Sequence, residues 1–373
     1  MDINEKIELI TRWPTEEILT QEDLKKLIES GEKLNHYFGI EVSGQLHIGQ
    51  GIGCMQKIAD LQKAGVNCTI FLADWHTWIN NKLGGKWENI QKGCEYIKEI
   101  LTAGLKCVGG DVKKINFVKG SEVYNNDYWR TVIDVSKNIN ISRILRSITI
   151  MGREEKEVTS FAQLMYPPMQ AADMFFLGFN LPHGGMDQRK IHVIAREAAA
   201  SLTSYPFKNK KGEIYKPIAL HTHLWLGLQK PSIWPIPKDM DRQELWTSMK
   251  MSKSKSNTAI FLTDAPEEIK KKINDAFCPE KIIEFNPIMD WLKSIAFYNN
   301  KIFTIKRPEK FGGNLEIKSF EELEKLYSDG KIHPLDLKNA AAEYLIKFLE
   351  PAREHFKDKQ HLIEMMKSFQ ITR

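Results

Sequence analysis

Residues 36–73 decide the fold, and they read HYFGIEVSGQLHIGQGIGCMQKIADLQKAGVNCTIFLA. Aromatic and β-branched residues dominate both ends of this stretch, as is typical of strands. Between the ends, apolar residues recur at the spacing of one helix face, at Ile48, Ile52, Met55 and Ala59. The pattern predicts a β-α-β unit, and therefore two parallel strands joined by a helix.

The turn into this helix has the chemistry of an anion site. The first N–H groups of a helix have no partner within it, and the helix dipole adds a positive potential there. Gly44 and Gly49 would let a phosphate approach the backbone, and His47 and Gln50 add side-chain donors. A plain surface turn explains this stretch equally well, because short glycine motifs match by chance.

The composition is that of an ordinary globular protein, with 42% hydrophobic and 27% charged residues among 373. A formal net charge of +5 permits a polyanionic partner without requiring one. The five cysteines form no C-x-x-C pair and are odd in number, which favours a reducing compartment. No signal peptide or membrane-spanning run is evident, so we expect a cytoplasmic protein.

The flanking segments extend the same architecture. Residues 1–35 predict an N-terminal helical arm packed on the sheet, with Thr20 capping a helix. The run DWHTW at 74–78 follows the second strand, at the sheet edge where ligands bind in such folds. A helix is expected over 87–105 and a strand over 114–118. Residues 122–160 look mostly helical and basic, which is typical of a solvated helix pair or of a subunit interface bordered by nucleic-acid contacts.

A helix near residue 170 carries polar side chains on one face. Pro167 and Pro168 are expected to mark its first turn, where proline is tolerated. Tyr166, Gln170 and Asp173 then fall at i, i+4 and i+7 in an otherwise apolar segment. An exposed polar stripe would explain this pattern. A buried set would need partners, and a polar ligand could supply them.

Strands are expected within 177–185 and 217–228, before a proline-punctuated region, residues 229–257. This region ends in the run MKMSKSKSN, which is typical of a solvated loop or of a mobile clamp over a triphosphate. Residues 263–373 predict a separate, mainly α-helical domain. Its helical patterns cover 269–276, 288–295, 320–327 and 336–349, with a β-like piece at 303–307.

Two of these stretches together resemble known signatures. HIGQ at 47–50 and KMSKS at 250–254 resemble the HIGH and KMSKS motifs of class I aminoacyl-tRNA synthetases. Within that class the chain is similar to tyrosyl-tRNA synthetases of the archaeal and eukaryotic type. The matching stretches are YFGIE (37–41), YPPMQAAD (166–173), GGMDQRK (184–190), KRPEKFGG (306–313) and HPLDLK (333–338).

The resemblance implies an α/β fold. A Rossmann-like parallel-sheet catalytic domain would span 36–262 after the arm 1–35, and a mainly α-helical anticodon-binding domain would span 263–373. Within the catalytic domain, residues 122–160 would form a helical dimer and acceptor-stem insertion, and residues 229–257 the KMSKS loop region. The implied enzyme is a homodimer that uses ATP, with Mg²⁺ accompanying the nucleotide and no dedicated metal site. It would form tyrosyl-adenylate and pyrophosphate from L-tyrosine, then transfer the tyrosyl group to the 3′ end of tRNA(Tyr).

The resemblance also implies roles for the tyrosine site. Tyr37 and Asp173 would hydrogen-bond the phenolic hydroxyl of tyrosine. Its ammonium group would meet Tyr166, Gln170 and Gln188. Tyr124 stands where relatives can carry glutamine, so whether it contacts the substrate stays open.

For ATP and tRNA, the implied residues belong to other motifs. His47 and Gln50 would donate to phosphates, and Gly49 would let adenine lie against the backbone. Gln50 replaces the second histidine of HIGH, which keeps a donor but removes a titratable group. The loop residues implied in ATP binding are Lys250, Ser252 and Lys253, whose lysines would neutralise the departing pyrophosphate. The residues implied in tRNA binding are Arg146 and Arg189 at the acceptor stem and Phe311, His333 and Asp336 at the anticodon.

Three other functions compete with this interpretation. A tryptophanyl-tRNA synthetase shares the fold and both signatures, although a tryptophan site has little use for Tyr37 and Asp173. A nucleotidyltransferase that adenylates a small acid would not need the C-terminal domain. An inactive RNA-binding relative would not need the complete lysine loop. The resemblance gives no role to residues 229–248 or 361–373.

Overall fold

The structure is a computed structural model, and it describes residues 1–253, 255–298 and 302–369, except for the side chains of Gln243 and Phe311. The chain forms two compact units. The first comprises the described parts of Met1–Gly44, Cys54–His223 and His361–Arg373. The second comprises the described parts of Gln45–Gly53 and Leu224–Gln360. The boundaries of these two units differ from those of the expected domains 1–35, 36–262 and 263–373. The division into functional domains therefore stays a prediction.

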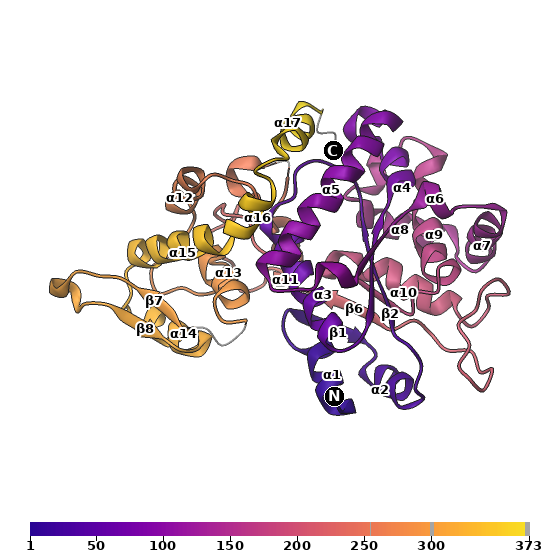
Figure 1. Cartoon of the computed structure of the whole chain (residues 1–373), viewed down its shortest axis with the longest axis horizontal. Helices are drawn as coiled ribbons and strands as arrows, with labels where there is room; N and C mark the ends of the chain where they lie inside the picture. Colours follow the sequence, from indigo (N-terminus) through magenta and orange to yellow (C-terminus); the bar gives the residue numbers. More distant parts are fainter. Residues whose placement is uncertain (254, 299–301, 370–373) are drawn as a thin grey trace. The chain divides into compact units, whose positions relative to one another are not determined.

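The first unit is built on a six-stranded sheet in the order β1-β6-β5-β2-β3-β4. Strands β1, β2 and β6 of this sheet are labelled in Figure 1. Neighbouring strands from β6 to β4 pair in parallel, whereas β1 pairs antiparallel with β6 at one edge. The fold prediction of a Rossmann-like parallel sheet is thereby confirmed. The strands are β1 Thr15–Leu19, β2 Asn35–Ile40, β3 Asn67–Leu72, β4 Ile115–Lys119, β5 Leu181–Gly185 and β6 Ala219–Thr222.

The predicted β-α-β unit is confirmed. Strand β2 pairs in register with β3, with Phe38 opposite Ile70, and β2 also pairs with β5 on its other side. The chain therefore changes direction across the sheet between β2 and β5, which is the switch point where ligands bind in open α/β sheets. A π-helical turn, η1 Gly49–Gly53, precedes the helix α3 Cys54–Lys63.

The helices of the first unit follow the predicted pattern, with one difference in α9. Helix α9 runs over Phe161–Phe176, so Pro167 and Pro168 lie inside it and not in its first turn. Ser160 and Gln163 form a capping box that begins the helix earlier than the prolines suggest. The other helices are α1 Ile3–Thr11, α2 Gln21–Glu29, α4 Asp74–Ile79, α5 Trp87–Cys107, α6 Gly120–Val123, α7 Asn126–Lys137, α8 Ile141–Ser147 and α10 Arg189–Ala198. Short 3₁₀ turns are η2 Lys82–Gly85, η3 Val112–Lys114, η4 Ile148–Met151, η5 Glu155–Glu157 and η6 Met186–Gln188.

The N-terminal arm is only partly helical, which corrects the prediction of a helical arm. Thr20 caps α2 as expected, because its hydroxyl accepts a hydrogen bond from the backbone of Asp23 at 3.1 Å. Between α1 and α2, however, the strand β1 joins the sheet through β6. The run TEEIL gave no strand signal because its pairing partner is distant in sequence.

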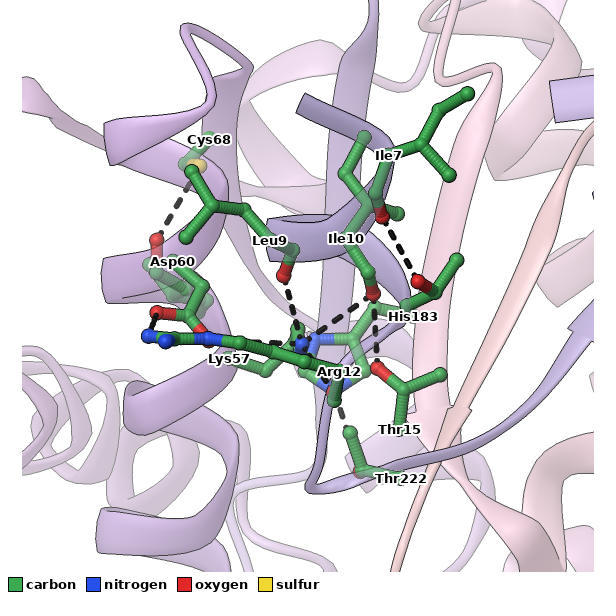
Figure 2. A network of polar contacts seen from close by, with 12 residues as sticks. Ile7, Leu9, Ile10, Arg12, Thr15, Lys57, Asp60, Cys68, His183 and Thr222 are labelled. Carbon is green, nitrogen blue, oxygen red and sulfur yellow. Dashed lines mark hydrogen bonds and ion pairs between the residues drawn. The ribbon is translucent and has the colours of Figure 1, made fainter. Parts of the chain in front are cut away.

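A buried lysine fastens α1 to α3 (Figure 2). The ammonium of Lys57 donates to the carbonyl oxygens of Leu9, Ile10 and Arg12 at 3.0, 3.3 and 2.9 Å. Asp60, one turn further along α3, lies 3.6 Å from that ammonium and accepts a 2.9 Å hydrogen bond from Nε of Arg12. Since a buried charge needs partners, these contacts make the end of α1 part of the core.

The described part of the second unit contains the four predicted helices, two helices that were not predicted, and a hairpin. The helices are α11 Arg242–Met249, α12 Pro266–Asn274, α13 Pro287–Ile295, α14 Phe320–Ser328, α15 Pro334–Phe348 and α16 Glu350–His355. Strand β7 Phe303–Ile305 pairs antiparallel with β8 Leu315–Ile317. Short 3₁₀ turns are η7 Ser256–Thr258 and η8 Glu309–Phe311. Helix α11 lies within residues 229–257, which the sequence suggested to be a loop region. Helix α17 Gln360–Ser368 was also not predicted, and all of it after Gln360 belongs to the first unit.

Along the described residues, no helix combines the length and the apolar character needed to cross a membrane.

Candidate active site

The first unit gathers hydroxyl groups around a buried carboxyl group. Asp173 of α9 is fully buried. Tyr124, which follows α6, donates to its Oδ1 at 2.6 Å. Tyr37 of β2 lies at the limit of hydrogen bonding, 3.5 Å from Oδ2. The imidazole Nε2 of His76, on α4, lies 3.8 Å from the same oxygen. One carboxyl oxygen is therefore firmly held, and the other is held only loosely.

Burial governs the charges in this cluster. Burial raises the pKa of Asp173 well above its usual value, against the opposing effect of the tyrosine hydroxyls. Burial likewise raises the pKa of Tyr37 and of Tyr124, and the negative charge of Asp173 adds to both shifts. Burial lowers the pKa of His76 from 6.5 to about 3, so its ring is neutral at pH 7. The cluster thus surrounds one carboxyl group with uncharged polar groups, an arrangement suited to a neutral hydroxyl.

The remaining predicted tyrosine contacts form a second group, with Tyr166 and Gln170 on α9 and Gln188 on η6. Gln170 donates through Nε2 to Oε1 of Gln188 at 3.2 Å, and Gln188 in turn donates to the carbonyl of Ile150 at 2.9 Å. Among the described residues, the buried Oε1 of Gln170 has no hydrogen-bond partner. The ring of Tyr166 stands edge-on to His76 at 4.6 Å between centroids. These contacts leave an amide oxygen available to accept from a cationic ligand.

In the second unit, the His47 turn is fixed by the segment after the lysine loop. His47 forms a bridge with Phe261, and the backbone N–H of Ile48 donates to the carbonyl of Ile260 at 2.8 Å. A Cβ at Gly49 would lie 3.2 Å from Nδ1 of His47 and 3.3 Å from Cβ of Trp225. The absence of a side chain at Gly49 therefore lets its backbone pack closely against the His47 ring and Cβ of Trp225. The backbone N–H of Gln50 donates to the carbonyl of His47 at 3.1 Å, which tightens the turn.

The same tryptophan ties the lysine loop to this turn. The carbonyl of Trp225 accepts from the backbone N–H of Met251 at 2.7 Å, and Lys250 forms a bridge with Leu226. Burial, with the positive charges of Lys253 and Lys250, lowers the pKa of His47 from 6.5 to about 3. The HIGQ and KMSKS motifs therefore share one compact unit, in which a neutral imidazole and two lysine charges influence one another. In the same loop, the carbonyl of Ser252 accepts from the backbone N–H of Lys255 at 3.2 Å.

Within the described chain, no three His, Cys, Asp or Glu side chains form a group that could hold a metal ion.

The predicted acceptor-stem residues lie at the surface of the first unit. Arg146, near the end of α8, is exposed, and its Nε donates to the carbonyl of Ser142 at 3.2 Å. Arg189, at the start of α10, donates through Nε to both carboxylate oxygens of Glu17, at 3.0 and 2.8 Å. The next residue, Lys190, donates to the carbonyl of Arg146 at 3.1 Å. This lysine links the segments that carry the two arginines.

The predicted anticodon residues belong to the second unit. His333 is exposed and caps α15, accepting through Nδ1 from the backbone of Leu335 at 3.2 Å. Asp336 lies in the first turn of that helix. The side chain of Phe311 lies outside the described part of the structure. The cap contact gives His333 a structural role in addition to any RNA contact.

Three residues at these sites were not assigned from the sequence. Tyr124 was left open, and it makes the shortest hydrogen bond to Asp173. His76 belongs to the run DWHTW, whose place after the second strand was the available signal. No sequence pattern indicated a role for Trp225, because it contributes a backbone carbonyl acceptor and packing against glycine.

This chain resembles known proteins in both sequence and structure. A family model described as class I tRNA synthetases (W and Y) matches residues 29–350. The tyrosine–tRNA ligase of Thermococcus kodakarensis is 54% identical over 376 residues, covering 100% of both chains. That of Pyrococcus abyssi is 52% identical over the same coverage. The crystal structure of tyrosyl-tRNA synthetase from Pyrococcus horikoshii, complexed with L-tyrosine, aligns with a TM-score of 0.96 at 50% identity, covering 99% of this chain and 100% of that one.

Proposed function

Because the chain belongs to the class I tRNA synthetases of the tryptophan and tyrosine family, we infer that it attaches tyrosine to tRNA. It is an ATP-dependent tyrosine–tRNA ligase. It activates L-tyrosine with ATP to tyrosyl-adenylate and pyrophosphate, then transfers the tyrosyl group to the 3′ end of tRNA(Tyr). The observation that carries this function is the full-length identity of 54% to a tyrosine–tRNA ligase, and the hydroxyl-lined carboxyl group of Asp173 agrees with it.

We propose that Asp173 and Tyr37 bind the phenolic hydroxyl of tyrosine. Oδ1 of Asp173 already accepts from Tyr124 at 2.6 Å, whereas Oδ2 has its nearest hydroxyl donor at 3.5 Å. A phenol that donates to Oδ2 would complete the solvation of this buried oxygen. Phenylalanine and tryptophan cannot make that contact, so they would leave a buried acceptor unsatisfied.

We propose that Gln170, Gln188 and Tyr166 hold the ammonium group of the substrate. The unpartnered Oε1 of Gln170 supports this role, because an ammonium group is a donor only. The Gln170–Gln188 hydrogen bond fixes which end of the Gln170 amide faces the ligand. Tyr166 would add a hydroxyl oxygen as a further acceptor.

For ATP, we assign the phosphates to His47, Gln50, Lys250, Ser252 and Lys253, and the adenine to the backbone at Gly49. The tyrosine carboxylate attacks the α-phosphorus, and the bond to the bridging oxygen of pyrophosphate breaks. No covalent enzyme intermediate is needed, so these residues act by positioning and by stabilising charge. The pKa of about 3 for His47 supports a neutral hydrogen-bond donor there. The two lysines would stabilise the departing pyrophosphate.

We propose that Mg²⁺ enters only with the nucleotide. The described residues offer no ligand set for a metal ion of the protein's own, so we derive no step through a resident metal. Any magnesium would be held by the phosphates themselves.

For tRNA, we propose acceptor-stem contacts by Arg146 and Arg189, and anticodon recognition by Phe311, His333 and Asp336. Exposed guanidinium groups suit the phosphates and base edges of RNA. Stacking by rings and reading of base edges by a carboxylate are the usual means of recognising an unpaired base. In this division, residues 263–373 form the anticodon-binding domain.

We propose that the enzyme is a homodimer whose contact lies in residues 122–160, and that it works in the cytoplasm. Two large apolar side chains in this segment are exposed, Ile133 at 57% and Ile141 at 76%, and Phe161 just beyond it is exposed at 76%. Such residues are typical of a protein interface. The five cysteines are free thiols, which agrees with a reducing compartment.

The test of the function is amino-acid-dependent exchange between ATP and pyrophosphate. Tyrosine should support exchange, and tryptophan and phenylalanine should not. Exchange with tryptophan alone would identify a tryptophanyl enzyme, and absence of any exchange would identify an inactive relative. Exchange without binding of tRNA(Tyr) would favour an enzyme that adenylates a small acid. Sedimentation of an Ile141→Asp variant tests the dimer, because only a buried interface would be broken by that charge.

A further inference from the structure

We propose that Glu17 is a positioning residue for tRNA recognition, whose carboxylate holds the guanidinium group of Arg189 in the orientation that meets the acceptor stem. The inference rests on the acceptor-stem role proposed above for Arg189. It gives the N-terminal arm a part in tRNA recognition, because Glu17 lies on the edge strand β1.

The contact uses only one nitrogen of the guanidinium. Nε of Arg189 donates to Oε1 and Oε2 of Glu17 at 3.0 and 2.8 Å. Within the described part of the chain, the two Nη groups make no hydrogen bond. Since the guanidinium is planar, fixing Nε also fixes the plane in which the four Nη–H donors point. The side chain of Arg189 remains 45% exposed, so those donors are accessible to RNA.

Glu17 also contacts the interior of the first unit. His221 is its cross-strand partner on β6, and Nδ1 of this fully buried histidine lies 2.9 Å from Oε2, a close polar contact without hydrogen-bond geometry. The other ring nitrogen of His221 lies 2.9 Å from Nδ1 of His192. The two rings stack with their centroids 5.0 Å apart. The carboxylate therefore packs against two buried, stacked imidazole rings, which limit where it can move.

The contacts close into a ring. His192 belongs to α10, the same helix that begins at Arg189. The chain of contacts runs from Arg189 to Glu17, then to His221 and His192. It thus ends on α10 again, about one turn after Arg189. A closed path of this kind restricts the arginine more than a single surface ion pair would. An isolated surface ion pair contributes little to the stability of the fold. The effect that matters here is that the long side chain of Arg189 is held in order, which lowers the cost of ordering it on binding.

The charge of Glu17 and its geometry predict opposite effects on tRNA binding. A carboxylate beside the site repels RNA phosphates, so a purely electrostatic role predicts tighter binding when the charge is removed. Orientation of Arg189 predicts weaker binding when the acceptor is removed. Glu17→Gln removes the charge but keeps one acceptor oxygen, whereas Glu17→Ala removes both. The pair of variants therefore separates the two effects.

The experiment is steady-state aminoacylation of tRNA(Tyr) by the full-length enzyme, with tyrosine-dependent pyrophosphate exchange measured in parallel. Glu17→Ala should raise the KM for tRNA about tenfold with kcat nearly unchanged, as expected when one charge-assisted contact is lost from binding. Glu17→Gln should recover most of that loss. Pyrophosphate exchange should match the parent enzyme in both variants, which also shows that they are folded.

Two further variants decide what a different result means. Asp23→Ala removes a comparable ion pair of the same arm, in which Nη2 of Arg196 donates to Asp23 at 2.7 Å, and it should leave the KM for tRNA unchanged. Arg189→Ala should raise that KM at least as much as Glu17→Ala, and the double variant should equal Arg189→Ala alone. If Arg189→Ala raises the KM and Glu17→Ala does not, or if Glu17→Ala tightens binding, the positioning role is wrong. If Arg189→Ala itself has no effect, the proposed role of Arg189 is wrong, and the positioning role falls with it.

Discussion

Tyr124 donates a hydrogen bond of 2.6 Å to Oδ1 of Asp173, so half of this buried carboxyl group is engaged by the protein itself. The phenol ring of Tyr124 also stacks on Tyr128, with their centroids 3.5 Å apart and their planes within 6°. The hydroxyl that meets Asp173 is therefore supplied by a ring that packing holds in place. It follows that Tyr124 determines which oxygen of Asp173 remains for a ligand.

Replacing Tyr124 by Phe should weaken tyrosine activation. The change deletes a donor to a buried carboxyl oxygen, and an unsatisfied buried acceptor costs about 1–3 kcal/mol. We expect kcat/KM for tyrosine in pyrophosphate exchange to fall by about tenfold. Tyr215→Phe is the control, because its hydroxyl accepts from Asn180 at 3.1 Å and has no contact with Asp173. An equal loss in both variants would contradict a specific role for Tyr124.

Asp173→Ala and the isosteric Asp173→Asn should both weaken tyrosine activation and relax the rejection of phenylalanine. With the carboxyl group gone, phenylalanine no longer leaves a buried acid unsatisfied. The ratio of kcat/KM for tyrosine to that for phenylalanine should fall by about 10- to 100-fold, because leaving a buried acceptor unsatisfied costs about 1–3 kcal/mol. Pyrophosphate exchange with each amino acid measures the ratio. An unchanged ratio would remove Asp173 from the specificity site.

Lys253→Ala should slow adenylation with little change in tyrosine affinity. The lysine charge is expected to act on the pyrophosphate as it departs, so its loss appears in the rate of the chemical step. We expect the single-turnover rate of adenylate formation to fall by at least about tenfold. Lys255→Ala in the same loop is the matched control and should react at the parent rate. If Lys253→Ala leaves the adenylation rate unchanged, the proposed role of Lys253 in stabilising the departing pyrophosphate is wrong.

Acid should destabilise the protein through His36. Burial lowers the pKa of this residue from 6.5 to about 3. Between those values the unfolded chain binds a proton that the folded chain does not, so the free energy of unfolding falls as the pH drops from 6.5 toward 3. The slope is about 1.4 kcal/mol per pH unit for one such group. Urea unfolding from pH 7 to pH 4 measures it, and His36→Gln should show a slope smaller by about one proton. If the free energy of unfolding changes with pH at the same slope in the parent protein and in His36→Gln, His36 does not titrate in this way.

Much of the fold was predictable because its signals are local. The apolar spacing around Met55 gives a helix between two strands, and the structure contains them in the expected order. Strand β1 was not predictable, since the pairing of Glu17 with His221 joins residues far apart in sequence. The start of α9 was misjudged because the capping box of Ser160 outweighs the usual preference of proline for a first turn.

The candidate site was predictable for those of its residues that lie on a single helix. The helical spacing of Gln170 and Asp173 gave their common face, and the family resemblance supplied Tyr37 and Gln188. The contacts of His76 and Tyr124 with Asp173 depend on how α4 and the segment after α6 approach α9, which no local pattern encodes. Trp225 acts through its backbone carbonyl, which is the same group in every residue type.

The buried ammonium of Lys57 makes the two ends of helix α1 unequal as places to engineer the protein. Met1 is 69% exposed, so a purification tag fused ahead of it can extend into solvent without disturbing the core. A truncation that removed Leu9, Ile10 and Arg12 would instead leave the ammonium of Lys57 without its carbonyl acceptors. Shortened versions made for crystallisation should therefore retain the last turn of this helix.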